Sequence, residues 1–377
     1  MTLQGWLDQL LGQPVSMRAL ALLRVFAGPI VLLHLQPFLS DLLQGEIYRD
    51  RFYEPYAAWY PELPRAAYGA LLWVGAAAAV LTCVGLFTRV ATATTFGVVA
   101  YNLFLSTTHV HSNRAYLLIV LAGLALAPCG RELSVDAWRR ARRGLPPLDA
   151  EAPAWPLWLL RFEAVAVYGA SGLSKLVDPD WFGGTVTRRR VVNVRDQLVD
   201  SPLPAWAVSV LTDRTFHTYA AKVIVLTELF IAVGLCWRGT RYAAVWVAVA
   251  FHVAIEISAS VQVFSYLAIA ALAIWAVPST GDRVLGLDPG SPSHARLGTA
   301  VRLLDWLDRF RTVPGQPGSA VTVTDRDGSV LRGKPAVVLV LSRLPLTAWL
   351  ALPARRVGPN RRRPQARPAW PGSAEEG

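Results

Sequence analysis

The sequence predicts an all-α integral membrane helical bundle of about eight transmembrane helices, followed by a small α+β cytoplasmic tail. Of the 377 residues, 53% are hydrophobic and only 17% are charged, whereas a soluble domain carries roughly a quarter charged residues. The mean hydropathy is +0.36. Apolar runs of bilayer length recur through most of the first 280 residues. These observations exclude a disordered or fibrous chain and argue against a purely cytosolic enzyme.

Eight segments are long enough, or nearly long enough, to cross a hydrocarbon core of about 30 Å. The amphipathic lead before the first has no basic start and no small-residue cleavage site, so we expect no cleavable signal peptide. The eight run from about Met17 to Phe38, Ala66 to Phe87, Val90 to Thr107, Ala115 to Pro128, Trp155 to Leu176, Tyr219 to Trp237, Tyr242 to Ile257 and Ala259 to Val277.

The positions of the basic residues predict the orientation in the membrane. The net charge of +11 lies mostly between or after the apolar runs, where a membrane protein keeps its cytoplasmic charge. An inside N-terminus places Arg89, the basic stretch 131–143, Arg238, Arg241 and the basic tail in the cytoplasm, and the arginines at 188–190 are the contrary evidence. We therefore expect a multi-pass protein of the plasma membrane of a bacterium, with both termini cytoplasmic, the lipid bilayer as partner and no nucleic acid.

The composition changes after Pro278, and we expect four regions in the whole chain. Inside the last 100 residues, Leu297 to Phe310 is amphipathic, 320–323 and 329–331 predict a β-hairpin, and 334–344 predicts a short helix. The four regions are a transmembrane domain at 1–280, an amphipathic helix and linker at 281–318, a small fragment at 319–353 and a disordered basic tail at 354–377.

Motifs for common soluble chemistries are absent from the sequence. The three cysteines, Cys83, Cys129 and Cys236, lie far apart, which excludes a disulfide framework and a cysteine-rich zinc module. The sequence contains no phosphate-binding loop, dinucleotide fingerprint, zinc-protease motif or nucleophile elbow. We expect no metal site.

Ionisable side chains inside membrane spans are costly and therefore mark candidate sites. With alternating helix directions and a rise of about 1.5 Å per residue, many of them, together with two loop histidines, fall in the exoplasmic half of the bilayer. Those expected in that half are Lys175, Lys222, Glu228, His252, Glu256, His109 and His111; the others within spans are Arg24, His34, Arg161 and Glu163.

Structural roles are open for each of these groups. His252 and Glu256 lie one turn apart, which is typical of a hydrogen bond between packed helices. Lys175 and Lys222 could extend toward headgroups, with Glu228 as the counter-charge of Lys222. The chain has only three lysines among its 37 basic residues, and a desolvated lysine can give up its proton whereas arginine cannot. Lys175 is therefore worth testing as a base.

Three segments resemble the HTTM (horizontally transferred transmembrane) family, whose best-known members are the vitamin K-dependent gamma-carboxylases. The first is Tyr-Gly-Ala-Ser-Gly-Leu-Ser-Lys-Leu at 168–176, followed by Asp-Trp at 180–181 and a glycine at 184. The second is Asn-Arg-Ala-Tyr-Leu at 113–117, with Ser-Val-Asp at 134–136, and the third is Phe-His at 251–252, with Phe-Ser-Tyr-Leu at 264–267. The resemblance covers about residues 15–278 in matching order.

The resemblance implies a lysine base and a reduced quinone of the vitamin K type. In the carboxylases, a lysine at the position of Lys175 deprotonates the hydroquinone, and CO2 is then added to a glutamate of a protein substrate. His252 matches a histidine of the same site. The catalytic candidates are therefore Lys175 and His252, and the substrate-binding candidates are Asn113, Arg114, Trp181, Glu228 and Glu256.

The sequence also departs from that family. Arg114 stands where the carboxylases have a histidine, Ser174 replaces a second lysine, and the large exoplasmic region that holds protein substrates is missing. The tail at 323–337 resembles the back half of the DCC thiol-disulfide oxidoreductase family, without its Asp-Cys-x-x-Cys motif; with no cysteine after Cys236, it cannot carry out dithiol chemistry.

Three functions remain open at this point. The first is a carboxylase-like membrane enzyme that uses a reduced quinone. The second is a membrane protein without carboxylase activity that assists the maturation or export of a secreted peptide, as the sporulation-delaying protein B type does. The third is a transporter, but the sequence shows no inverted repeat or paired broken helices.

Overall fold

The computed structural model describes residues 2–45, 55–192, 204–237, 239–259, 261, 263–276 and 283–348. The chain divides into two compact units, Met1–Val277 and Pro278–Gly377. Unit 1 is mostly helical and unit 2 combines helices with a sheet. The predicted disordered tail at 354–377 lies outside the described residues.

Each of the eight predicted spans coincides with a helical segment of unit 1. The eighth consists of α14 (Val263–Ala271) and the short 3-10 helix η2 (Leu272–Trp275). The others are α2 (Arg18–Gln44), α3 (Arg65–Val84), α4 (Thr88–Phe104), α5 (Ser112–Leu126), α7 (Trp155–Val177), α12 (Arg214–Cys236) and α13 (Arg241–Ala259). Among the described residues, three helices, α2, α3 and α12, are long and apolar enough to cross a membrane by length and composition.

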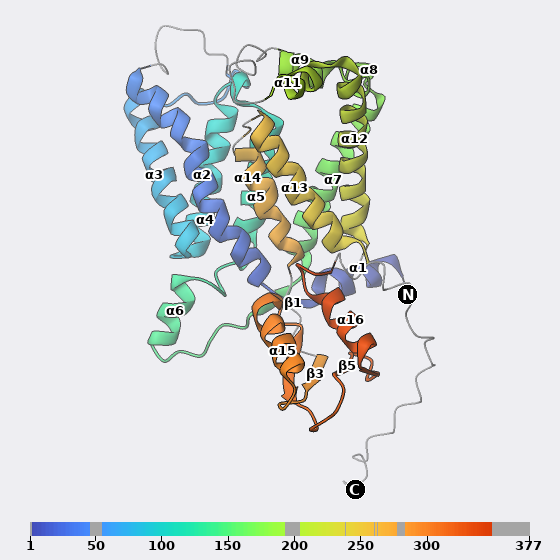
Figure 1. Ribbon diagram of the computed structural model, residues 1–377. Coiled ribbons are helices and arrows are strands. Elements are labelled where there is room, and N and C mark those ends of the chain that lie inside the picture. Colours follow the sequence, from blue (N-terminus) through green and yellow to red (C-terminus); the bar gives the residue numbers. More distant parts are fainter. Residues whose placement is uncertain are drawn as a thin grey trace. The chain divides into compact units, whose positions relative to one another are not determined.

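Shorter elements join these helices. A 3-10 helix, η1 (Thr107–His109), connects α4 to α5. At the end of unit 1 where α7 ends and α12 begins, α8 (Pro179–Phe182), α9 (Thr185–Val192) and α11 (Ala205–Thr212) pack together (Figure 1). The remaining elements are α1 (Leu3–Gly12), α6 (Val135–Arg142) and the antiparallel pair β1 (Pro14–Ser16) and β2 (Glu151–Pro153).

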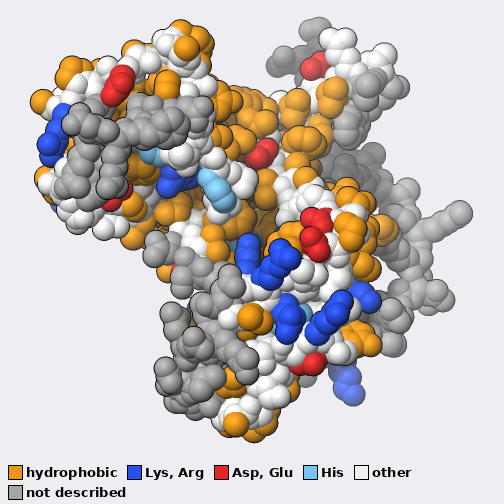
Figure 2. All heavy atoms as spheres, turned by 90° about the horizontal axis from the view of Figure 1, so that it is seen from above, with side chains coloured by type: hydrophobic (Ala, Val, Ile, Leu, Met, Phe, Trp, Pro, Cys, Tyr) orange, Lys and Arg blue, Asp and Glu red, His pale blue; other side chains and the backbone are white. Residues whose placement is uncertain are grey.

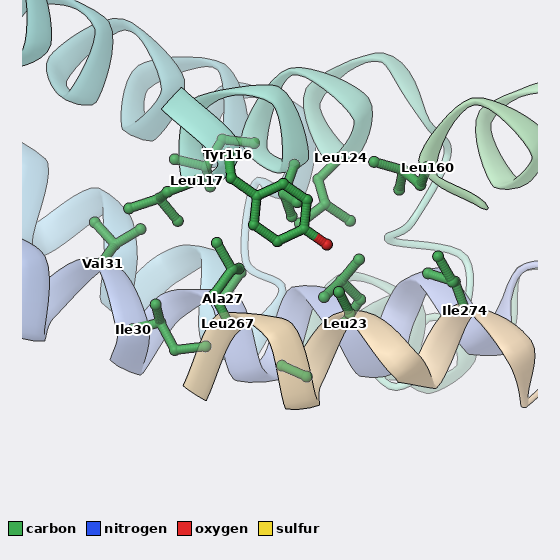
Figure 3. Packing of buried hydrophobic residues seen from close by; sticks show 14 of the residues in the cluster. Leu23, Ala27, Ile30, Val31, Tyr116, Leu117, Leu124, Leu160, Leu267 and Ile274 are labelled. Carbon is green, nitrogen blue, oxygen red and sulfur yellow. The ribbon is translucent and has the colours of Figure 1, made fainter. Parts of the chain in front are cut away.

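The core of unit 1 lies where α2, α5, α7 and α14 meet. Figure 3 shows Tyr116, Leu117 and Leu124 of α5 facing Leu23, Ala27 and Val31 of α2, with Leu267 of α14 beside them. These side chains are almost fully buried, and burial of each large apolar side chain stabilises the fold by roughly 1.5–3 kcal/mol in water. Inside a lipid bilayer, where that gain vanishes, close packing takes over its role.

A close contact fixes the relative direction of α5 and α7. A Cβ atom at Gly123, late in α5, would lie 2.8 Å from Cδ2 of Leu160, which is early in α7. The two helices are therefore antiparallel, and the end of α7 lies at the same end of unit 1 as the start of α5. Unit 1 thus brings Lys175 and Arg114 to one end, as the alternating spans predict.

A buried arginine holds the opposite end of unit 1. Arg24 of α2 is fully buried, and its guanidinium donates to the carbonyl oxygens of Thr82, Cys83 (2.9 Å), Cys129 (3.3 Å) and Leu133 (2.6 Å). Two of these carbonyls, those of Thr82 and Cys83, belong to the last turn of α3, where the backbone N–H of Gly85 also donates to Thr82 (3.3 Å). Arg24 therefore caps α3 and holds the 129–133 loop against it.

The short helix α6 follows the 129–133 loop and lies against the start of α4. Asp136 accepts hydrogen bonds from the backbone N–H of Phe87 (2.9 Å) and of Thr88 (2.8 Å) and from the Thr88 hydroxyl (2.8 Å). Burial alone would raise the pKa of Asp136, but these hydrogen bonds outweigh it and hold the pKa below its ordinary value. The carboxylate thus caps the start of α4 and fixes α6 beside it.

Unit 2 contains a four-stranded mixed sheet of order β4-β3-β5-β6. The predicted hairpin is β5 (Thr322–Thr324) and β6 (Val330–Arg332), and the predicted short helix is α16 (Lys334–Arg343). The sequence missed β3 (Arg283–Leu287) and its parallel partner β4 (Phe310–Pro314), which are joined through α15 (Pro292–Leu304). One sheet therefore includes strands from both sides of residue 318, the expected boundary between two regions.

Candidate functional site

The candidate site centres on an ion pair between α7 and α12. The Nζ atom of Lys175, in the last turn of α7, lies 2.6 Å from Oε1 of Glu228 on α12. Their side chains are only 17% and 6% exposed. Lys175 Nζ also donates to the hydroxyl of Ser171 at 2.8 Å, and that hydroxyl donates to Glu228 Oε1 at 3.0 Å. Three polar groups thus form a closed triangle of contacts between α7 and α12.

Small residues let the two helices approach closely enough for this pair to form. A Cβ atom at Gly172 would lie 2.9 Å from Cδ2 of Leu229 and 3.3 Å from Cβ of Glu228. Gly169, three residues earlier, faces Ala232 of α12. Small residues at helix interfaces are typical of close packing in membranes. The sequence Gly-Ala-Ser-Gly at 169–172 therefore supplies both the close approach and the hydroxyl of the site.

An aromatic ring covers the outer side of the amine. Lys175 Nζ lies 5.0 Å from the ring centroid of Trp181 in α8, and the guanidinium of Arg190 lies 5.7 Å from the same ring. A cation over an indole face gains electrostatic attraction. Trp181, a predicted substrate-binding residue, is thus beside Lys175.

His252 belongs to a neighbouring contact on the same face of α7. Its Nε2 lies 2.7 Å from the hydroxyl of Tyr168, which precedes Lys175 by seven residues, or two helical turns. The imidazole is 1% exposed, and the rings of Phe251, Phe264 and Tyr168 surround it at centroid distances of 5.5 to 5.7 Å. The bond joins α7 to α13.

Two buried atoms at these contacts have no hydrogen-bond partner within the described part of the chain. They are Oε2 of Glu228 and Nδ1 of His252. Buried polar atoms are nearly always paired, so each atom has unused capacity for a ligand. The pair on α7 and α12 and the pair on α7 and α13 could therefore both bind a polar group of a substrate.

The structure separates other predicted residues from this ion pair. Arg114, at the start of α5, donates to the carbonyl of His109 at 3.2 Å and lies 4.8 Å from the ring of Phe38. Asn113 donates its backbone N–H to Nδ1 of His111 at 3.3 Å. These contacts lie around α2, η1 and α5, and no contact in the described residues joins them to Lys175.

The structure decides the structural roles left open for Glu228, Glu256 and His252. Glu228 is the counter-charge of Lys175 and not of Lys222, whose Nζ lies 5.5 Å from the ring of Phe182 and 5.8 Å from that of Tyr219. Glu256 accepts from the hydroxyl of Tyr266 at 3.5 Å, and His252 bonds to Tyr168 of α7, which is a hydrogen bond between packed helices.

Sequence reasoning missed Tyr168 and Ser171 as members of the site. Both precede Lys175 at spacings of seven and four residues, which places all three on one face of α7. That helical spacing could have identified Tyr168 and Ser171 as neighbours of Lys175 from the sequence alone. No group of three or more His, Cys, Asp or Glu side chains in the described residues could hold a metal ion.

The family model for the HTTM domain matches residues 12–279. This chain belongs to the HTTM family. The HTTM domain coincides with unit 1 and contains the Lys175–Glu228 pair. Together with the apolar helices, the family indicates a membrane protein. No curated protein and no solved structure matches the chain.

Proposed function

We propose that the HTTM domain is a multi-pass domain of the plasma membrane that transfers a proton between Lys175 and a reduced quinone. The observation that carries the proposal is the 2.6 Å contact between Lys175 Nζ and Glu228 Oε1. Helices α7 and α12 supply the two groups from opposite sides, and a lipid-soluble substrate reaches such a site from the bilayer without a soluble pocket.

The chemistry follows from the ion pair and its apolar surroundings. Ionised groups are disfavoured away from water. Moving the proton from the ammonium of Lys175 to Glu228 produces a neutral amine and a neutral acid, and that amine is a base. The amine then accepts the proton of a quinol hydroxyl, and Ser171 holds both partners in register through its two hydrogen bonds.

The unpaired atoms of the site fit a quinol as the substrate. Glu228 Oε2 and His252 Nδ1 are buried polar atoms that could hydrogen-bond the substrate oxygens. Trp181, beside the amine, would present an aromatic face to the ring of the substrate. A bound reduced quinone would supply the oxidisable ring and dissolved dioxygen would be the oxidant; the carboxylase-like use of that oxidation for adding CO2 to a secreted protein is part of the proposal.

The proposed orientation places the N-terminus and the C-terminus in the cytoplasm. Arg89 at the start of α4 and the arginines of α6 lie at the end of the HTTM domain opposite to Lys175. This bias follows the positive-inside rule, and it puts the Lys175 site in the exoplasmic half. In this orientation the three exposed arginines of α9, Arg188, Arg189 and Arg190, would lie on the exoplasmic side, against the rule.

A quinol-consumption assay on membranes tests the proposal. Replacing Lys175 by Ala or by Arg should abolish consumption, because neither side chain can accept a proton. Lys222→Ala is the matched control, since Lys222 is a second lysine near the same end but lies over Phe182 and Tyr219 instead of Glu228, and it should keep wild-type activity. Wild-type consumption in Lys175→Ala would contradict the proposal.

A second function is favoured by one departure from the carboxylases. Arg114 stands where they have a histidine and binds the His109 carbonyl, which agrees with a membrane protein that assists the maturation or export of a secreted peptide. Mass spectrometry of secreted proteins with and without this gene separates the two functions. The first function is supported if secreted proteins carry added CO2 and this modification depends on Lys175. The second is supported if an unmodified peptide disappears from the medium when the gene is deleted and returns when the Lys175→Ala variant is expressed.

A further inference from the structure

Arg161 is a buried cation without a carboxylate partner in the part of the chain that the structure describes. It lies in the second turn of α7 and is 8% exposed. Its Nε (3.2 Å) and Nη2 (3.0 Å) both donate to one acceptor, the carbonyl oxygen of Ile274. Among the described residues, no Asp or Glu forms an ion pair with it. A guanidinium has five N–H donors, so one shared carbonyl leaves its charge largely uncompensated.

A second arginine lies on the same tryptophan. The guanidinium carbons of Arg161 and Arg241 lie 4.8 Å and 5.1 Å from the ring centroid of Trp275. Arg161 is also 5.2 Å from the ring of Trp158. Two like charges this close in apolar surroundings repel each other, and an anion between or beside them would turn that repulsion into attraction.

The remaining polar atom of this cluster is also a donor. The Nε1 atom of Trp275 is buried and has no acceptor within the described residues, and Trp275 is 4% exposed. Arg161 and Trp275 thus both have unused N–H donors in the described part of the chain, while Arg241 donates from Nε to the carbonyl oxygen of Leu235 at 3.2 Å. Arg241 is half-buried, so a ligand from outside the protein can reach its side chain, whereas Arg161 and Trp275 are almost fully enclosed.

The position of the cluster indicates which anion it meets. Arg161 is near the start of α7, Arg241 begins α13, and Trp275 ends η2. All three are therefore at the end of the HTTM domain opposite to Lys175. Trp155 and Trp237, both exposed, lie at the same helix ends, and tryptophans are enriched where membranes meet water. At that depth the abundant anion is phosphate, for which arginine has matching geometry.

We propose that Arg161, Arg241 and Trp275 form a binding site for a phosphate group, which an anionic phospholipid headgroup or free phosphate would supply. The guanidiniums donate to the phosphate oxygens, and the tryptophan rings hold the guanidiniums in place. The site is separate from the proposed quinol chemistry, because it uses no residue of the Lys175 pair and lies at the other end of α7.

The experiment measures the thermal unfolding midpoint of the purified, delipidated full-length protein in detergent. Phosphatidylglycerol should raise the midpoint by roughly 5 °C at saturation, and diacylglycerol, which has the same acyl chains without phosphate, should not raise it. An equal rise with inorganic phosphate alone would identify free phosphate as the source. If neither phosphatidylglycerol nor inorganic phosphate raises the midpoint, the proposal is wrong.

Substitutions locate the effect on the protein. Arg161→Gln and Arg241→Gln should each remove at least about half of the rise, because each deletes one cation of the pair. Arg89→Gln is the matched control: it deletes an exposed arginine at the same end of the domain and should keep the full rise, as should Lys175→Ala. If Arg161→Gln does not fold, the half-buried Arg241→Gln decides. A full wild-type rise in Arg241→Gln places the binding elsewhere.

Discussion

Arg24 and Lys175 are both enclosed cations of the HTTM domain, but their surroundings differ. Arg24 is fully buried and donates to four backbone carbonyls that belong to two segments of the chain, the end of α3 and the 129–133 loop. Lys175 donates to a hydroxyl and to one oxygen of a carboxylate whose other oxygen has no partner in the described residues. A saturated cation holds a fold, whereas an incompletely paired one has capacity left for a ligand or a proton.

The largest predicted effect is at the saturated cation. Arg24→Met would leave several buried carbonyls without a donor, and each such group costs about 1–3 kcal/mol. We expect a loss of at least about 3 kcal/mol of unfolding free energy, measured as a drop in the thermal midpoint and in the yield of folded protein. A variant that unfolds like the wild type would show that Arg24 does not hold α3 and the 129–133 loop.

The second prediction concerns the incompletely paired cation. Glu228→Gln leaves the ammonium of Lys175 without its counter-charge and should destabilise the domain by about 2–3 kcal/mol, less than for a fully buried pair because Lys175 is 17% exposed. The double variant Lys175→Met/Glu228→Gln removes the isolated charge and should recover much of the loss. A double-mutant cycle measures the coupling, and additive effects would show that the two groups do not interact.

The third prediction tests the close approach of α7 and α12. A Cβ at Gly172 would lie 2.9 Å from Leu229, so Gly172→Ala should push the helices apart and cost about 1–2 kcal/mol. It should also reduce quinol consumption, because the Lys175–Glu228 distance would increase. Gly97→Ala in α4 is the control, since nothing lies within 4 Å of a Cβ there; it should be neutral or stabilise the helix by up to about 1 kcal/mol.

The smallest effect is at the Asp136 cap beside the Arg24 region. Because hydrogen bonds hold the pKa of Asp136 below its ordinary value, its contribution to stability is present above the unfolded pKa of about 3.9 and is lost as the pH falls through the lower folded pKa. Asp136→Asn should cost roughly 1 kcal/mol at pH 7. Unfolding midpoints at pH 3 to 7 should fall less steeply with acid in this variant than in the wild type.

The helices were predictable from the sequence, but their pairing was not. Each apolar run became a helix because a run of that length must satisfy its own backbone hydrogen bonds in an apolar medium. Lys175 and Glu228, by contrast, are separated by 53 residues, and nothing in the spacing of α12 shows that Glu228 faces α7 while Lys222 faces aromatic rings. The hydroxyl of Ser171 and the ring of Tyr168 were inside the recognised motif, yet their partners lie on other helices.

The sheet of unit 2 shows the same limit. The β5–β6 hairpin is joined by a short turn, so local signals predict it. Strands β3 and β4 are parallel and need α15 between them, and a parallel pairing leaves no local turn signal in the sequence. Strand β3 lies between β4 and β5. It is so short that its sequence does not stand out from the linker residues around it.

Tyr168 and Lys175 lie on one face of α7. Tyr168 is hydrogen-bonded to His252 of α13, and Lys175 forms an ion pair with Glu228 of α12. A rotation of α7 about its own axis would therefore strain both interhelical bonds together, and both α13 and α12 would have to shift with it. Occupancy at the lysine end could in this way change how tightly the tyrosine end is held. Such mechanical linkage would let one substrate adjust three helices with a single small movement.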